Sequence, residues 1–203
     1  MPVIVVANPK GGVGKSTFAT NLAGYFASCG HKVMLGDADI QQSSRAWLSL
    51  RPACLPPVSA WEVATGYLMR PPHGTTHVVL DTPAGFDGFR LEQALQMADK
   101  IVVPLQPSMF DILATQTFLQ MLLARRIKAA IGVLGMRVNL RTRAAEQLAH
   151  YVTGLGVPVL GHLRDTQNYV QLAAHGTSLW DVAPSRVERD ILQWQDVLEW
   201  IEK

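Results

Sequence analysis

The sequence predicts a single-domain α/β P-loop fold, with a mostly parallel twisted sheet and helices on both faces. A glycine-rich octet at residues 10–17, KGGVGKST, directly follows an apolar run at residues 3–7. Short apolar runs then alternate with helical patterns, as in right-handed β-α-β crossovers. With 203 residues, 48% hydrophobic and 17% charged, the chain is long enough for one well-buried domain, which we expect to span residues 1–203.

The apolar runs give the expected strands in order. After the first strand at residues 3–7, they predict strands near residues 32–36, 77–81, 100–104, 130–136 and 157–160. Residues 66–76 are rich in Pro, Gly and His and are expected to form a loop. Ser108, with Asp111 three residues later, predicts the start of a helix after the fourth strand.

The glycine-rich octet has the chemistry of a nucleoside triphosphate site. Backbone N–H groups in a loop that opens a helix bind anions, and Lys15 is placed to contact the β and γ phosphates. Ser16 is placed to ligate Mg²⁺, which prefers oxygen ligands. The residues expected to contact ATP are Lys10, Gly11, Gly12, Val13, Gly14, Lys15, Ser16 and Thr17. The alternative is an ordinary strand-to-helix turn.

The octet departs from the general pattern G-x-x-x-x-G-K-[ST] in an informative way. Pro9 occupies the first glycine position, and a second lysine, Lys10, precedes two adjacent glycines. Lys10 cannot easily reach its own phosphates from the strand side while Lys15 occupies them. A role for Lys10 across a subunit interface is therefore open.

Acidic residues follow two of the expected strands, where ligands bind in open α/β sheets. Asp37 and Asp39 lie two residues apart, so both can face a hydrated Mg²⁺ and an attacking water. A local turn that uses either carboxylate is the alternative. Asp81 ends a later apolar strand, and we expect it to hold Mg²⁺ through water. The predicted metal residues are Ser16, Asp37 and Asp81.

At these motifs the chain resembles the ParA/MinD family of deviant Walker ATPases, and the resemblance covers most of the chain. It implies that Lys10 contacts the nucleotide of the partner subunit in an ATP-sandwich homodimer. Asp39 would orient the attacking water, so Lys10, Lys15 and Asp39 are the expected catalytic residues. Ile40 replaces the usual proline of the family pattern, which leaves the first switch conformation open. The resemblance also implies that the Asn139 amide contacts adenine.

The segment from residue 121 to 165 is strongly basic, with seven basic and two acidic residues. Clustered Arg and Lys without interleaved aromatic residues suit contacts to a phosphate backbone, and the resemblance implies nonspecific DNA binding. A solvated basic face is the alternative. The candidate DNA-binding residues are Arg125, Arg126, Lys128, Arg141, Arg143 and Arg164.

The C-terminal segment argues against a membrane partner. Apolar residues recur at helical spacing, but residues 186–203 carry five acidic and three basic side chains, which anionic lipids would repel. We expect a helix that packs on the core through residues including Val187, Ile191, Trp194, Leu198 and Ile201. The starting sequence lacks the basic n-region of a signal peptide, and the solitary Cys29 and Cys54 fit a reducing cytoplasm.

The expected function is that of a ParA-type positioning ATPase with weak hydrolysis. Its ATP-bound dimer would hold nucleoid DNA, and a ParB-like or cargo adaptor protein would stimulate hydrolysis. The cargo would be a plasmid or chromosome locus, or an assembly such as a chemoreceptor array or carboxysome. Alternatives are a MinD-like division-site regulator and a small-molecule synthetase or kinase. Missing cysteine pairs disfavour a reductase or metal-delivery protein, and the absence of tyrosine after Tyr169 disfavours a tyrosine kinase.

Overall fold

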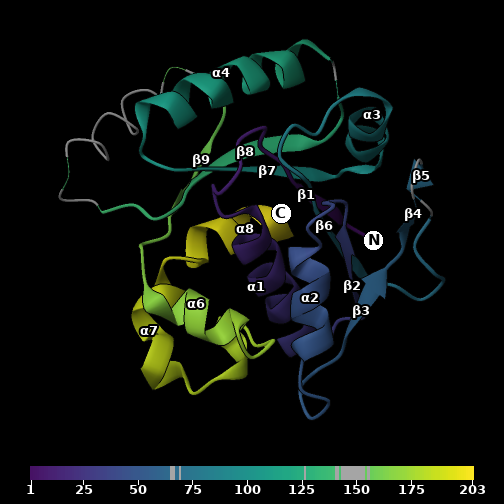
Figure 1. Cartoon of the computed structure of the whole chain (residues 1–203), viewed down its shortest axis with the longest axis vertical. Coiled ribbons are helices and arrows are strands. Elements are labelled where there is room, and N and C mark those ends of the chain that lie inside the picture. Colours follow the sequence, from purple (N-terminus) through teal and green to yellow (C-terminus); the bar gives the residue numbers. More distant parts are fainter. Residues whose placement is uncertain (65–66, 69, 126, 140–141, 143–153, 155) are drawn as a thin grey trace.

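The computed structural model describes residues 1–64, 67–68, 70–125, 127–139, 142, 154 and 156–203. A seven-stranded parallel sheet with the order β3-β2-β6-β1-β7-β8-β9 forms its centre (Figure 1). The strands are β1 (Val3–Val6), β2 (Val33–Asp37), β3 (Val58–Trp61), β6 (His77–Asp81), β7 (Lys100–Leu105), β8 (Ala130–Gly135) and β9 (Val159–His162). β4 (Val63–Ala64) and β5 (Tyr67–Leu68) form a separate antiparallel pair. The predicted α/β P-loop fold is confirmed.

Helices cover both faces of the sheet. They are α1 (Lys15–Ser28), α2 (Ser43–Leu50), α3 (Gly88–Met97), α4 (Met109–Ala124), α6 (Gln167–Ala173), the short 3₁₀ helix η1 (Leu179–Asp181), α7 (Pro184–Leu192) and α8 (Gln195–Glu202). In Figure 1, α3 and α4 lie on one side of the sheet, and α1, α2, α6, α7 and α8 lie on the other. Two apolar cores result, one on each face.

Strand β1 shows why the central strands read as continuous apolar runs. Successive side chains of a strand point to opposite faces. Val3 and Val5 therefore pack in the core beneath α3 and α4, whereas Ile4 and Val6 pack in the core beneath α1. Because both faces are covered, all four residues must be apolar.

Three features differ from the expectations: the edge strand β3, the C-terminal segment, and the short pair β4–β5, whose second strand lies within residues 66–76 that were expected to form a loop. Strand β3 was not predicted from the sequence; it is an edge strand whose one pairing partner among the described residues is β2, and its side chains at Ser59 and Ala60 are exposed. The C-terminal segment forms two helices, α7 and α8, where one was expected. Between them, Trp194 stacks on Phe18 with ring centroids 4.9 Å apart, and its Nε1 donates to the Tyr169 hydroxyl at 3.0 Å.

The expected packing of the C-terminal segment on the core is nonetheless confirmed. Val187, Trp194 and Ile201 are buried in the core on the α1 side of the sheet, and the partly buried Ile191 and Leu198 pack against it. Among the described residues, no helix is long and apolar enough to cross a membrane.

Candidate nucleotide-binding site

The glycine-rich loop connects the end of β1 to the start of α1, as the sequence predicts. Gly14 immediately precedes α1 and has φ 99°, and Gly12 has φ 75°, both in the left-handed region that favours glycine. A Cβ atom at Gly14 would lie 2.7 Å from the terminal Cε methyl of Met136, which would have to shift to make room. The loop thus opens onto the N-terminus of α1, where backbone N–H groups favour an anion.

Side chains from distant elements hold the loop in this conformation. Asn8 Nδ2 donates to the Pro104 carbonyl at 2.8 Å and to Thr115 Oγ1 at 2.9 Å, while Asn8 Oδ1 accepts from the Lys10 backbone N–H at 2.9 Å. Gln106 Nε2 donates to the Gly12 carbonyl at 2.7 Å. Asn8 and Gln106 could not be recognised as site residues from the sequence, since their roles depend on contacts with residues far away in the chain.

Lys15 folds back over the loop and is buried. Its Nζ donates to the Lys10 carbonyl at 2.8 Å and to the Asn8 carbonyl at 3.1 Å. Burial lowers the pKa of Lys15, and the carboxylates of Asp81 and Asp39 oppose this shift. The ammonium is therefore held in position by its own loop, beside the cavity that the loop borders.

The two carboxylates at and after the end of β2, Asp37 and Asp39, accept backbone hydrogen bonds. Asp37 Oδ1 accepts from the Asp39 N–H and Oδ2 from the Arg45 N–H, both at 3.0 Å, and Asp39 Oδ1 accepts from the Gln41 N–H at 3.0 Å. The local-turn alternative is thus observed for both residues. Asp39 also lines the cavity, whereas Asp37 is not among its described lining residues.

Asp81 provides the most direct sign of a cation site. It is buried, its Oδ2 accepts from the Ser44 hydroxyl at 2.7 Å, and its Oδ1 has no hydrogen-bond partner among the described residues. Burial raises the pKa of Asp81 to about 6, and the Ser16 hydroxyl is close enough to lower it in part. A buried carboxylate oxygen without a partner, near a serine hydroxyl, fits the oxygen ligands that Mg²⁺ prefers.

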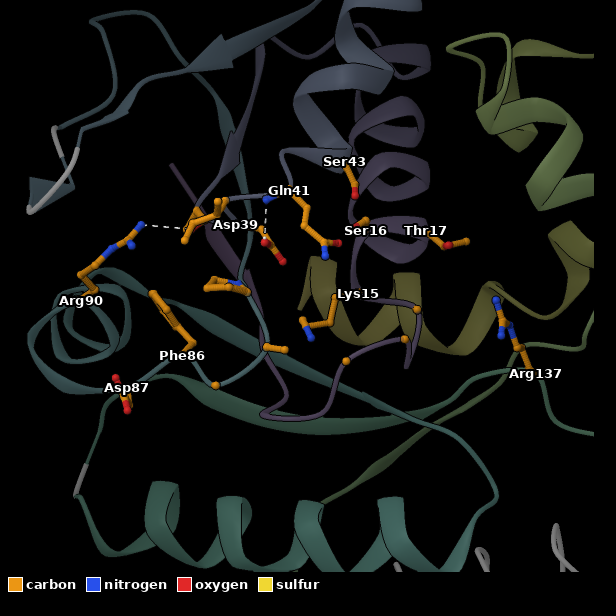
Figure 2. Close-up of a pocket in the computed structure, with 18 residues that line it drawn as sticks. Lys15, Ser16, Thr17, Asp39, Gln41, Ser43, Phe86, Asp87, Arg90 and Arg137 are labelled. Carbon is orange, nitrogen blue, oxygen red and sulfur yellow. Dashed lines mark hydrogen bonds between the residues drawn. The ribbon is translucent and has the colours of Figure 1, made fainter.

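The loop borders a cavity of about 670 Å³, within the size range of small-molecule sites. Figure 2 shows Arg137 at one end, beyond Thr17, Arg90 and Asp87 at the other, and Asp39, Lys15 and Ser16 between them. The full lining set is Gly11, Gly12, Gly14, Lys15, Ser16, Thr17, Ala38, Asp39, Ile40, Gln41, Ser43, Pro83, Ala84, Gly85, Phe86, Asp87, Arg90 and Arg137. The predicted ATP-binding loop therefore borders a cavity large enough for a nucleotide.

Arg90 joins the two loops that follow β2 and β6. Its Nη2 donates to the Ala38 carbonyl at 3.1 Å, and its guanidinium lies 5.9 Å from the centre of the Phe86 ring (Figure 2). Neither Arg90 nor Phe86 was a sequence-predicted site residue, because no local motif marks them. Through Arg90, the position of the loop after β2 is therefore linked to that of the loop after β6.

Lys10 lies outside the described cavity lining. Its side chain is 43% exposed, and its Nζ is 3.9 Å from Asp111 Oδ1 in the first turn of α4. The helix begins after Ser108 as predicted, but the Ser108 side chain makes no capping hydrogen bond. Asp111 therefore contacts the loop lysine in addition to lying in the first turn of α4.

Asn139 does not line the cavity. It is exposed, and its carbonyl accepts from the Thr142 N–H at 3.0 Å and from the Thr142 hydroxyl at 2.8 Å. Its predicted contact with adenine stays a prediction.

The structure describes only part of the predicted DNA-binding set. Arg126, Arg141 and Arg143 lie outside the described residues. Arg125 pairs with Glu92 at 3.1 Å, and Lys128 is exposed.

Arg164 is bound within the fold. Its Nε lies 2.5 Å from Oδ1 of the buried Asp190, whose Oδ2 accepts from Asn168 Nδ2 at 2.6 Å. This ion pair gives Arg164 a structural role. Among the described residues, Lys128 and Arg125 are therefore the better candidates for a DNA contact.

Comparison with known proteins identifies the family. Residues 4–179 match the CobQ/CobB/MinD/ParA nucleotide binding domain, and the chain belongs to this family. It is thus a ParA/MinD-type nucleotide-binding ATPase domain.

Among individual relatives, the maintenance of carboxysome distribution protein A of Halothiobacillus neapolitanus is 31% identical over 169 residues, which cover 77% of this chain and 76% of the relative. The protein of the same name from Gloeobacter kilaueensis is 39% identical over 112 residues, or 54% of this chain. That match spans 51% of the Gloeobacter protein, about half its length.

A solved structure supports the fold assignment. A plasmid partition protein of Borrelia burgdorferi bound to AMPPNP superposes with a TM-score of 0.73, and the match covers 98% of each chain. At 19% sequence identity this likeness shows the fold alone.

Proposed function

We propose that this chain is a positioning ATPase of the ParA type. Two copies close around Mg-ATP, the dimer binds DNA without sequence preference, and an adaptor protein stimulates hydrolysis that releases it. Two relatives are named for carboxysome distribution, which supports a large protein assembly as the cargo. The adaptor would be a ParB-like or cargo-bound protein, and the dimer would be associated with the nucleoid in the cytoplasm.

The exposed lysine of the loop carries this proposal. Lys15 already occupies the loop, whereas Lys10 lies outside the described cavity lining, near Asp111, with its side chain 43% exposed. A cation that borders the nucleotide loop without facing its own cavity is suited to the nucleotide of a second copy. The 3.9 Å contact with Asp111 is long for an ion pair, so little is lost when Lys10 changes partner.

The surface around Lys10 supports self-association. Met109 and Phe110 precede Asp111 on α4 and are 55% and 78% exposed, and Ile40 at the cavity is 94% exposed. A two-fold interface uses the same patch on both copies, so each copy must offer both charges of a pair. Lys10 and Asp111 meet that requirement, and the apolar side chains nearby would be buried by the second copy.

Within one subunit, the residues of the site would have distinct roles. The backbone N–H groups of the loop and Lys15 would bind the phosphates. Ser16 and Asp81 would hold Mg²⁺, which when bound neutralises the charge that develops on the phosphates. Asp39 would orient the attacking water after leaving its turn with Gln41.

The proposal is tested by the Asp39→Ala protein, which should accumulate in the ATP-bound state. Its binding to random-sequence duplex DNA and its mass in solution are measured with ATP, with ADP and without nucleotide. We expect a dimer that binds DNA only with ATP, with an affinity that falls steeply as salt rises. A monomer that ignores DNA in all three conditions would contradict the proposal and favour a small-molecule enzyme.

A further inference from the structure

Arg137 has an unusual backbone at the cavity rim. It follows the end of β8 and has φ 53°; among the described residues only Gln42 is another non-glycine with positive φ. A side chain in the left-handed region costs about 1–2 kcal/mol, so this conformation persists only where neighbouring contacts impose it.

The contacts on both sides of Arg137 explain that conformation. The Met136 N–H donates to the Leu105 carbonyl at 2.8 Å, and the Val138 N–H donates to the Leu163 carbonyl at 3.0 Å. The Met136 and Val138 side chains are both buried. With its two neighbours fixed in this way, Arg137 is held at the surface, where it lines the nucleotide cavity (Figure 2).

Within the described part of the chain, the guanidinium of Arg137 makes no hydrogen bond or ion pair. Other arginines of this fold are engaged: Arg51 pairs with the buried Asp181 at 2.9 Å, and Arg164 pairs with the buried Asp190. An exposed arginine held at a cavity rim by a strained backbone is available for a ligand.

The sheet order shows which end of a nucleotide would face Arg137. Strands β2 and β6, each of which ends in an aspartate, lie on one side of β1, and β7 and β8 lie on the other. In the proposed site, the terminal phosphate lies near Asp39, which would orient the attacking water, and Asp81, which would hold Mg²⁺. The nucleoside must then extend toward β8, and Figure 2 shows Arg137 beyond Thr17 at the end away from Asp39.

We propose that Arg137 binds the nucleoside half of the nucleotide, with its planar guanidinium stacked on the purine base. This assignment rests on the proposed nucleotide site. It gives Arg137 the base contact that the family resemblance assigned to Asn139, which lies outside the described cavity lining. Arginine suits this contact because its delocalised cation is weakly hydrated and stacks on aromatic faces.

The test compares nucleotides with a ligand that has phosphates but no base. Calorimetry measures the binding of ATP, ADP and inorganic tripolyphosphate, each with Mg²⁺, to the wild type and to Arg137→Gly. Glycine removes the side chain and relieves the positive φ, so this variant should fold at least as well as the wild type. Arg137→Lys keeps the charge without the planar group. Arg186→Ala, an exposed arginine on α7 away from the cavity, is the matched control.

We expect Arg137→Gly to weaken ATP and ADP about tenfold and to leave tripolyphosphate unchanged. Arg137→Lys should restore only part of the loss, and Arg186→Ala should change nothing. An equal loss for tripolyphosphate would overturn the base contact in favour of a phosphate contact. Unchanged nucleotide affinity would overturn it too. A wild-type protein that binds none of these ligands would contradict the proposed function itself.

Discussion

Replacing Asp81 with asparagine should stabilise the protein while it removes a predicted magnesium ligand. Burial raises the pKa of Asp81 from an ordinary 3.8 to about 6. The folded protein therefore keeps this proton to a higher pH than the unfolded chain does. The contribution of the Asp81 carboxyl to wild-type stability is therefore lost as pH rises from about 4 to about 6, whereas the neutral amide has no such dependence.

The difference between the ordinary pKa of 3.8 and the folded pKa of about 6 sets the size of the stabilisation. It corresponds to about 3 kcal/mol of unfolding free energy at pH 7.5, and about half of this at pH 5. Asparagine is similar in size, and its amide oxygen can still accept from the Ser44 hydroxyl. These values are upper limits, because the substitution also removes a carboxylate that favours the charged form of Lys15.

Urea unfolding at pH 7.5 and pH 5, with EDTA present, measures the difference. We expect Asp81→Asn to be more stable than the wild type at both values, with the larger gain at pH 7.5, and to lose magnesium-dependent ATP binding. The exposed Asp165→Asn is the control and should show neither effect. A variant that is less stable than the wild type at pH 7.5, or a gain that does not change with pH, would refute the reasoning.

Further substitutions test the loop and the ion pair between Arg51, just after α2, and Asp181 in η1. Gly14→Ala forces a Cβ onto a backbone at φ 99° and displaces the flexible end of Met136, so it should abolish nucleotide binding and lower stability by ~1–2 kcal/mol of backbone strain. Gly12→Ala, at φ 75° with open space around its Cβ, should cost a similar amount, and a urea midpoint unchanged from the wild type in both variants would contradict the strain account. Asp181→Asn leaves Arg51 buried without its charge partner and should cost about 3–5 kcal/mol, and thermal unfolding unchanged from the wild type would show that the pair is dispensable.

The fold could be predicted largely because its signals are local. Each central strand is a short apolar run, and the glycine-rich octet lies directly between a strand and a helix. Strand β3 escaped detection because an edge strand has only one neighbour and its sequence, Val-Ser-Ala-Trp, carries little apolar pattern. The break before α8 depends on Trp194 packing against Phe18, a contact that no local pattern encodes.

Some residues of the candidate site could likewise be predicted from local motifs, and others could not. Lys15, Ser16 and Asp39 lie within short motifs and line the cavity, although their roles stay predictions. Arg137 and Arg90 could not be found, because their place at the cavity follows from a backbone conformation and from the meeting of two loops.

Ion-pair partners in distant parts of the chain are equally invisible to local patterns. Arg164 was predicted to contact DNA from its charge, but its partner Asp190 is 26 residues away in the sequence and becomes a neighbour only on folding.

The central claim is that Lys10 acts on the nucleotide of a second copy, and the mass of the protein in solution tests it most directly. Light scattering is recorded with saturating Mg-ATP for Asp39→Ala alone and combined with Lys10→Ala, with Lys32→Ala as an exposed lysine control. Calorimetry checks that ATP still binds. We predict that the protein with Lys10→Ala binds ATP but stays monomeric, while the control forms dimers. An ATP-dependent dimer that forms equally well without Lys10 would contradict the account.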